Sequence, residues 1–254
     1  NIGKSHLEGF GGLEGVIKGK SELYDFLIAN RGVLLHNSHN RVLADKIAGY
    51  DSVYTYGVDP HDYLYGIIHE HAAFAEVEMD NVLVHSKLVG SFNGYNMLAA
   101  ACVGKYFDIP LEQIKWAIEN YQPQNNRSQW QQYGDNYFIL DAYNANPSSM
   151  QAAIDHFDKM QVQPKILILG DMLELGAYAE TEHRQILNAA LKKSFMSIIL
   201  VGSTFSSVAP PEILHFPSVA EAKEWFDAQQ FHNTYFLIKG SRGIKLEKIT
   251  EDIR

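Results

Sequence analysis

The loop that follows the apolar run 137–140 contains side chains that could bind a ligand. Asp141 ends the run, and Asn144 and Asn146 lie just before Pro147. Open α/β sheets bind ligands beyond the carboxyl ends of their parallel strands, so we expect a carboxylate here to face the binding crevice. The two asparagines could add amides to the same site, although turn chemistry alone could explain either of them.

A second loop of this kind follows the run 165–169, Lys-Ile-Leu-Ile-Leu, which is typical of a buried parallel strand. Asp171 and Glu174 lie in it, and His183 follows a little further on. Two acids at a strand end could hold a metal ion or an amine. The alternative is structural, because negative charge is favourable at the N-terminus of the helix that follows.

Cations accompany these acids. The last apolar run ends in Lys-Gly-Ser-Arg-Gly at 239–243, so Ser241 and Arg242 are expected at the same edge of the sheet. Glycines beside a hydroxyl and a guanidinium at a strand end suit a phosphate or carboxylate ligand. Arg127, in the polar stretch 122–128, could reach a phosphate held between two domains, although a linker arginine is usually just solvated.

Lys20 stands out in the first half of the chain. Residues 12–29 have the periodicity of one helix, and Lys20 falls in the middle of its apolar stripe, which consists of Leu13, Val16, Ile17, Leu23, Tyr24 and Leu27. A buried lysine is costly unless it is paired or altered, and a desolvated lysine loses its proton readily. We therefore expect a reactive lysine, with a side chain that reaches solvent from the core edge as the alternative. His6, together with Glu8, could make half of a metal site.

Asn93 and Asn96 lie three residues apart at the predicted start of a helix. Their amides can project to one side and could contact a base edge or a ribose. Asn93 could equally be a simple helix cap. The spacing does not decide between these two interpretations.

The elements that must position these residues alternate in the second half. We predict strands over 137–141, 165–169, 197–202 and 234–239, and helices over 149–160, 180–193, 218–229 and 245–253. This order is typical of a parallel, doubly wound α/β sheet. Residues 1–120 are less regular, with helices expected near 12–29, 39–48, 94–107 and 111–120, and strands at 32–36, 52–56, 63–68, 74–79 and 82–88. The polar stretch from 122 predicts a boundary between domains 1–121 and 122–254.

Composition restricts the class of protein. The chain has 254 residues, 46% of them hydrophobic, and a formal net charge of −9. It can bury a large core, and its acidic balance argues against nucleic-acid or membrane-surface binding. The one cysteine, Cys102, lies in an apolar run and fits a core residue in a reducing compartment. No apolar run is long enough to span a bilayer, and the start at Asn1, without Met, leads us to expect a fragment.

Taken together, these motifs resemble the Mur ligase family. The resemblance rests on Tyr-Asn-Ala-Asn-Pro at 143–147, Gly-Asp-Met-Leu-Glu-Leu-Gly at 170–176 and Lys-Gly-Ser-Arg-Gly at 239–243. It implies the rear part of the family's central ATP-binding domain over 1–121, and its Rossmann-like C-terminal ligase domain over 122–254. The family's Gly-Lys-Thr phosphate loop has no counterpart here, so we expect the chain alone to be inactive.

The resemblance also implies roles for the residues named above. Lys20 would be a carbamylated lysine that helps to bind Mg²⁺, with His6 as a ligand of the same ion. Asn93 and Asn96 would face the adenine of ATP, Arg127 its phosphates and Asp141 its ribose. The residues near the incoming peptide or an acyl-phosphate would be Asn144, Asn146, Asp171, Ser241 and Arg242. Of all these, Lys20, Arg127 and Asp171 would take part in catalysis.

The implied activity is that of an ATP- and Mg²⁺-dependent amide ligase of peptidoglycan precursor synthesis. It would join D-alanyl-D-alanine to UDP-N-acetylmuramoyl-tripeptide through an acyl-phosphate, as a cytoplasmic monomer without nucleic-acid or membrane partners. Two other classes stay open. One is a sister ligase of the Mur or folylpolyglutamate type that adds a different amino acid. The other is a non-catalytic α/β binding module, which predicts an unmodified, solvent-facing Lys20.

Overall fold

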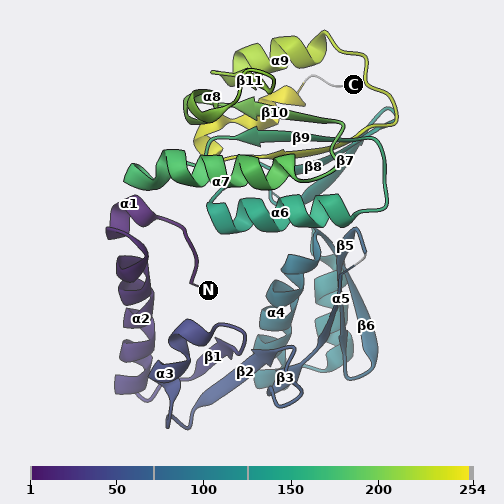
Figure 1. Ribbon diagram of the computed structural model, residues 1–254. Coiled ribbons are helices and arrows are strands. Elements are labelled where there is room, and N and C mark those ends of the chain that lie inside the picture. Colours follow the sequence, from purple (N-terminus) through teal and green to yellow (C-terminus); the bar gives the residue numbers. More distant parts are fainter. Residues whose placement is uncertain (1, 71, 125, 252–254) are drawn as a thin grey trace. The chain divides into compact units, whose positions relative to one another are not determined.

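The computed structural model describes residues 2–70, 72–124 and 126–251, and Figure 1 shows its helices and strands. The chain divides into two compact units, Asn1–Gln122 and Pro123–Arg254, called unit 1 and unit 2 below. Within the described ranges, no helix has the length and apolar character needed to cross a membrane.

Unit 1 contains two small sheets. Strands β1 (Leu34–Asn37), β2 (Val53–Gly57) and β3 (Leu64–Tyr65) form a parallel sheet, and β4 (Ile67–His69), β5 (Phe74–Met79) and β6 (Val82–Val89) form an antiparallel sheet. The strand predicted at 63–68 is therefore two strands, because the chain leaves one sheet and enters the other at Gly66. The helices are α1 (Leu7–Phe10), α2 (Leu13–Ala29), α3 (Ala44–Ile47), α4 (Gly94–Tyr106) and α5 (Leu111–Asn120), with 3-10 turns η1 (Arg41–Leu43) and η2 (Ser91–Asn93).

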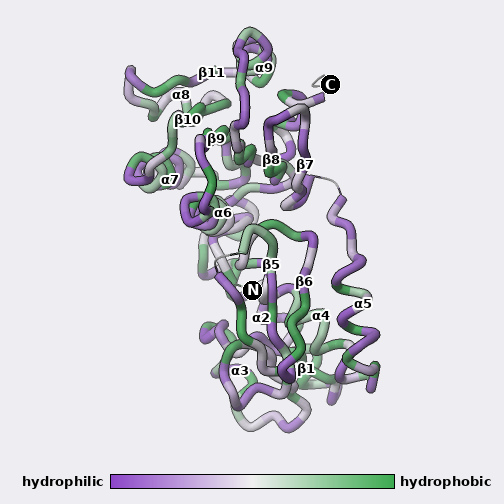
Figure 2. The backbone as a smooth tube through the Cα atoms, turned by 90° about the vertical axis from the view of Figure 1, so that its right-hand side faces the viewer, coloured by the Kyte–Doolittle hydropathy of each residue, from purple (hydrophilic) through white to green (hydrophobic). Residues whose placement is uncertain are grey.

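The core of unit 1 forms where α4 and α5 cover one face of the antiparallel sheet. Alternate residues of β5, such as Ala75 and Val77, are fully buried, as the period of a strand requires. Cys102 of α4 is buried among them, as predicted. Figure 2 shows hydrophilic and hydrophobic residues alternating along α5, which buries Ile114 and exposes Trp116.

Unit 2 is a six-stranded sheet with the order β11-β10-β9-β12-β8-β7. All neighbouring strands are parallel except β7 and β8, which are antiparallel. The strands are β7 (Gln129–Tyr133), β8 (Asn136–Asp141), β9 (Lys165–Gly170), β10 (Ser197–Val201), β11 (Leu214–Phe216) and β12 (Tyr235–Lys239). The prediction of a doubly wound parallel sheet is confirmed.

Helices cover both faces of this sheet. They are α6 (Pro147–Lys159), α7 (Ala179–Leu191), α8 (Ser203–Val208) and α9 (Val219–Asp227), with 3-10 turns η3 (Gly176–Tyr178), η4 (Arg242–Ile244) and η5 (Leu246–Ile249). Figure 1 shows α6 and α7 on one face and α9 on the other. Right-handed crossovers explain the two faces, because the chain moves one way along the sheet from β9 to β11 and returns to β12.

The strands at the centre of this sheet have the burial expected of a parallel sheet covered on both sides. Every residue of β9 is buried, including Lys165 at its start, which matches the apolar run from Ile166 to Leu169. Between β8 and β12 the rings of Phe138 and Phe236 stack with their centroids 4.7 Å apart. The strand ends, and the polar loops that follow them, are therefore carried on a rigid base.

The helix predicted at 245–253 is wrong. Lys245 has φ +61°, a left-handed conformation that an α-helix cannot continue through, and the chain then forms only the short turn η5. The last three residues, 252–254, lie outside the described part of the chain.

Candidate functional site

Three loops of unit 2 lie side by side because their strands are parallel neighbours. Strand β12 lies between β8 and β9, and Lys239 is in register with Asp141 on one side and with Leu169 on the other. The structure thus brings the predicted residues at 141–146, 171 and 241–242 to one edge of the sheet.

An ion pair joins the ends of β8 and β12. Nζ of Lys239 lies 2.5 Å from Oδ2 of Asp141 and 3.2 Å from the backbone oxygen of Asn144. Oδ1 of Asp141 accepts the backbone N–H of Ser128 at 3.2 Å. The lysine side chain is 2% exposed and the aspartate side chain 15%. Both carboxylate oxygens already accept hydrogen bonds from the protein, so Asp141 here orients the lysine and the loop instead of facing an open crevice.

Two arginines flank one aromatic ring at the same edge. The guanidinium carbon of Arg127 lies 3.7 Å from the centre of the Tyr143 ring, and that of Arg242 lies 5.3 Å from it. A hydrogen bond with Arg127, together with the positive charges of both arginines, lowers the pKa of the Tyr143 phenol. Both arginines are exposed. Guanidinium groups held in this way suit an anion with several oxygens, such as a phosphate or carboxylate.

Asp171 is 2% exposed, and its carboxylate points at helix α8. Its oxygens accept the N–H of Thr204 at 2.9 Å and of Phe205 at 2.8 Å, which satisfies two N–H groups of the first helical turn. The acid therefore binds the N-terminus of a helix, as the structural alternative predicted. The helix is α8, whereas the prediction had named the next helix in the sequence, which is α7. In this structure both carboxylate oxygens of Asp171 are engaged by α8, and its role in catalysis stays a prediction.

Ser241 and Asn146 also bind the protein. The hydroxyl of Ser241 is buried and accepts the N–H of Leu173 at 2.9 Å. Asn146 caps α6: its side chain accepts the N–H of Ser149 at 2.9 Å, and its own N–H donates to the Ser149 hydroxyl at 3.1 Å. Asn144 is exposed. Substrate contacts by these residues stay predictions.

In unit 1, the two predicted adenine ligands are bonded to each other. The amide nitrogen of Asn93 donates to the backbone oxygen of Val89 at 2.8 Å, and its oxygen accepts the amide of Asn96 at 2.9 Å. Asn93 is buried and occupies the N-cap position of α4, but its side chain makes no capping hydrogen bond. Asn96 is exposed, and its contact with adenine stays a prediction.

The prediction that Lys20 lies within apolar packing is wrong. Lys20 is exposed, as are Leu13 at 45% and Leu23 at 60% from the same stripe of α2. Periodicity shows which residues share one side of a helix, but not whether anything packs against that side. His6 is exposed too. Among the described residues, no three His, Cys, Asp or Glu side chains are grouped so that they could hold a metal, so the Mg²⁺ site stays a prediction.

Three residues of the sheet edge had no predicted role. The sequence could have identified Lys239, because a lysine that directly follows four apolar strand residues needs a partner for its charge. His183 gave a weaker one, as a histidine one turn into a helix. Tyr143 gave none, because its two arginines come from distant parts of the sequence.

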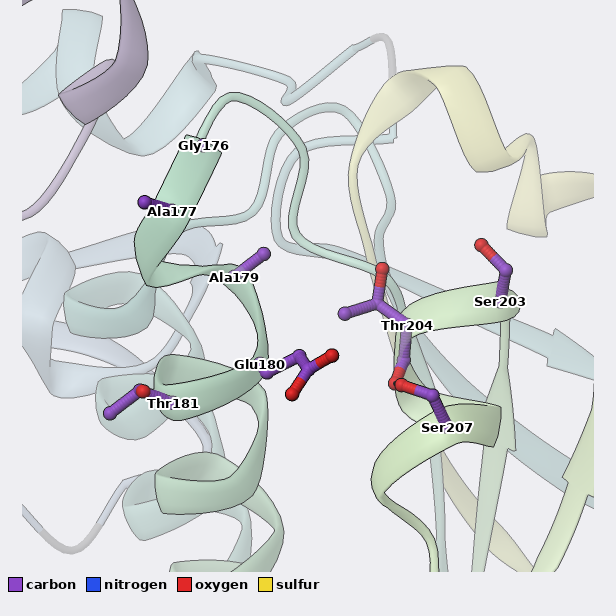
Figure 3. A pocket seen from close by; sticks show the side chains of 8 residues that line it. All are labelled: Gly176, Ala177, Ala179, Glu180, Thr181, Ser203, Thr204 and Ser207. Atoms are coloured by element: carbon purple, nitrogen blue, oxygen red, sulfur yellow. The ribbon is translucent and has the colours of Figure 1, made fainter.

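A hollow of about 550 Å³ lies beside this edge, between the first turn of α7 and helix α8 (Figure 3). Figure 3 shows the carboxylate of Glu180 turned towards Thr204 and Ser207 across it. The lining contains hydroxyls and one carboxylate but no Lys or Arg among the residues that the structure describes there. Its lining therefore suits an anion less well than the two arginines beside Tyr143 do.

Known proteins are similar to this chain in both sequence and fold. The model of the Mur ligase middle domain matches residues 1–104, and that of the Mur ligase glutamate ligase domain matches residues 126–242. The chain is 29% identical to UDP-N-acetylmuramoyl-tripeptide–D-alanyl-D-alanine ligase of Bacillus subtilis (strain 168), in a match that covers 100% of this chain and 58% of the relative.

Solved structures lead to the same conclusion. A crystal structure of MurF from Acinetobacter baumannii is 26% identical, with a TM-score of 0.86 over 100% of this chain and 58% of that one. MurF ligase from Thermotoga maritima in complex with ADP has a TM-score of 0.81 over 99% of this chain and 59% of that one, and at 18% identity it shows the fold alone. The chain thus spans less than two thirds of the length of these relatives. The resemblance found in the motifs is confirmed, and the chain belongs to the Mur ligase family.

Proposed function

We propose that this chain is part of an ATP-dependent ligase that joins D-alanyl-D-alanine to UDP-N-acetylmuramoyl-tripeptide in the cytoplasm. Curated relatives that match the whole chain have this activity in their names, and a protein of the same fold was crystallised with ADP. The observation in this chain that carries the proposal is the pair of exposed arginines on the Tyr143 ring, at the sheet edge where α/β proteins bind ligands.

The reaction explains why cations are needed there. ATP supplies a phosphoryl group to the terminal carboxylate of the tripeptide. The amine of the dipeptide then forms a bond with the acyl carbon, phosphate leaves and the nitrogen loses a proton. Negative charge collects on the phosphoryl oxygens in the transition state of the transfer. Arg127 and Arg242 can offset it, because guanidinium groups already held in place cost little reorganisation at that moment.

The proposal does not rest on Lys20. An exposed lysine is also what a non-catalytic binding module would show, so this residue no longer separates the two classes. The ligase and the binding module are instead distinguished by whether the arginine pair takes part in turnover.

The experiment uses the complete natural polypeptide that contains this sequence. Phosphate release is measured with ATP, UDP-N-acetylmuramoyl-tripeptide and D-alanyl-D-alanine, and with single amino acids in place of the dipeptide. Arg242→Lys is expected to lower kcat/KM about 10- to 100-fold, because lysine keeps the charge but loses the planar fork. Arg184→Lys, at another exposed arginine of the same unit, is the matched control and should leave the rate unchanged.

The substrate pattern decides between the three classes. Turnover with the dipeptide supports the proposal. Turnover with a single amino acid alone would identify a sister ligase, and the absence of ATP-dependent phosphate release with every amine would favour a binding module.

A further inference from the structure

Three successive residues after β9 are each held by a different element. Asp171 is bound to α8 through its side chain, as described above. The N–H of Met172 donates to Nε2 of His183 on α7 at 2.9 Å. The N–H of Leu173 donates to the hydroxyl of Ser241 after β12 at 2.9 Å. The loop is thus fixed from three sides by four hydrogen bonds, and the ring of His183 accepts one of them.

The hydrogen bonds of His183 define its protonation state. A backbone N–H can only donate, so Nε2, which receives the bond from Met172, carries no proton. Nδ1 lies 2.7 Å from the backbone oxygen of Ala179, a bond that needs a proton on Nδ1. The side chain is fully buried, and its ring meets that of Phe205 edge to face, with the two ring centroids 4.5 Å apart. His183 is therefore a neutral imidazole with one tautomer.

The surroundings keep this state. Burial lowers the pKa of His183, while the bond to Ala179 and the charges of Asp171 and Glu182 act in the opposite direction. Oδ1 of Asp171 lies 3.6 Å from Nε2, but it already accepts a backbone N–H of α8. A proton on Nε2 would have to displace the N–H of Met172, which would release the loop.

The part of the loop held in this way ends in a strained residue. Glu174 has φ +64°, a left-handed conformation that costs about 1 kcal/mol for a residue other than glycine. Such strain persists only where the neighbouring residues are held firmly, and it occurs most often at functional sites. Leu173 and Glu174 are exposed, beside the loop that carries Arg242.

We propose that His183 is a positioning residue of the ligase site, whose neutral ring fixes the loop 171–176 to α7 through Met172, next to the bond by which Ser241 fixes Leu173 to the loop after β12. The inference rests on the function proposed above. It adds a residue that touches no substrate but is required for the loop geometry in which the substrates meet the arginine pair.

Two substitutions separate the two bonds of the ring. His183→Gln places an amide oxygen near the position of Nε2, so that it can still accept the N–H of Met172. His183→Asn places its amide near Nδ1, so that it can still donate to Ala179 but cannot reach the loop. The two variants thus form a matched pair within the complete polypeptide.

His183→Asn is expected to lower kcat about tenfold, the effect of one lost hydrogen bond, with KM for ATP unchanged. Hydrogen exchange of the Met172 amide should become faster by a similar factor. His183→Gln should restore both values to within about threefold of the natural protein. Equal activities in the two variants, or equal exchange rates, would overturn the proposal.

A third measurement needs no variant, in case either one fails to fold. In the natural protein, two-bond ¹H–¹⁵N correlations of the ring should show a protonated Nδ1 and a bare Nε2 at pH 7. A charged ring, or the opposite tautomer, would refute the inference. If the natural protein shows no ligase activity, the proposed function fails, whereas amide exchange and the ring spectrum still test His183.

Discussion

Replacement of Lys239 by methionine should destabilise unit 2 strongly. The lysine side chain is 2% exposed and its ammonium lies 2.5 Å from the carboxylate of Asp141, which is itself 15% exposed. Methionine fills nearly the same volume, so the main effect is electrostatic. The largely buried carboxylate of Asp141 loses its counter-charge. Breaking a buried pair from one side costs about 3–5 kcal/mol. Because Asp141 keeps its bond from Ser128, we expect the free energy of unfolding to fall by about 3 kcal/mol.

A double-mutant cycle separates the pair from the individual side chains. Asp141→Asn removes the negative charge but can still accept the N–H of Ser128, and the double variant Lys239→Met with Asp141→Asn leaves no unpaired charge. The double variant should therefore be more stable than Lys239→Met alone, with a coupling energy of about 2–3 kcal/mol. The assay is urea unfolding followed by tryptophan fluorescence. In a Trp116→Phe background the two remaining tryptophans, Trp130 and Trp225, both report on unit 2.

A small coupling would refute this reasoning. If Lys239→Met costs less than about 1 kcal/mol, or if the two substitutions are additive, the ammonium is not paired as described. Lys223→Met is the control, because its ion pair with Asp227 lies on the surface of α9, where the carboxylate is 50% exposed. Exposed pairs contribute only about 0–1 kcal/mol.

Three further predictions concern the frame of unit 2. Lys165 is 3% exposed and its ammonium donates to three backbone oxygens around the end of α6, so Lys165→Met should cost about 3 kcal/mol in urea unfolding. Gly202 has φ +123°, and a Cβ there would lie 2.3 Å from the Asp171 carboxyl carbon, so Gly202→Ala should cost about 2 kcal/mol or more in the same assay. Burial lowers the pKa of His183, so below about pH 6.5 the unfolded chain binds a proton that the folded chain does not. The free energy of unfolding should then decrease as the pH is lowered below this value, by up to about 1.4 kcal/mol per pH unit. The slope should be shallower in His183→Gln.

The parallel sheet could be predicted because its signals are local and redundant. The run that forms β9 is apolar at each position from Ile166 to Leu169, which only a strand covered on both faces tolerates. Polar motifs then stand directly after β8, β9 and β12, so the shared edge follows from topology alone. By contrast, α8 and β11 are short and were not predicted. Such short elements have no periodic pattern and are stabilised by tertiary contacts, such as the hydrogen bonds from α8 to the carboxylate of Asp171.

The partners of charged side chains could not be predicted in the same way. The spacing in α2 placed Lys20 in a stripe, but burial depends on what packs there, and sequence periodicity carries no such information. The acid Asp171 was recognised as unusual, yet its target was a helix reached only after the next strand. Asp141 was placed at the correct edge, but its partner Lys239 lies almost a hundred residues further along. Which charged side chains pair depends on the order of the strands in the sheet. That order has to be known before the sequence can indicate the partners.

The charged residues of the sheet edge divide into two groups with different tasks. Asp141, Lys239 and Asp171 are largely buried and bonded to protein groups, so a ligand would have to replace existing bonds to reach them. Arg127 and Arg242 are exposed, and the ring of Tyr143 restricts both before a ligand arrives, which reduces the entropy lost on binding. In a chain of net charge −9, we expect this local positive charge to attract an anion to the edge. Ligand affinity and fold stability should therefore respond to different substitutions, affinity to the arginines and stability to the buried pair.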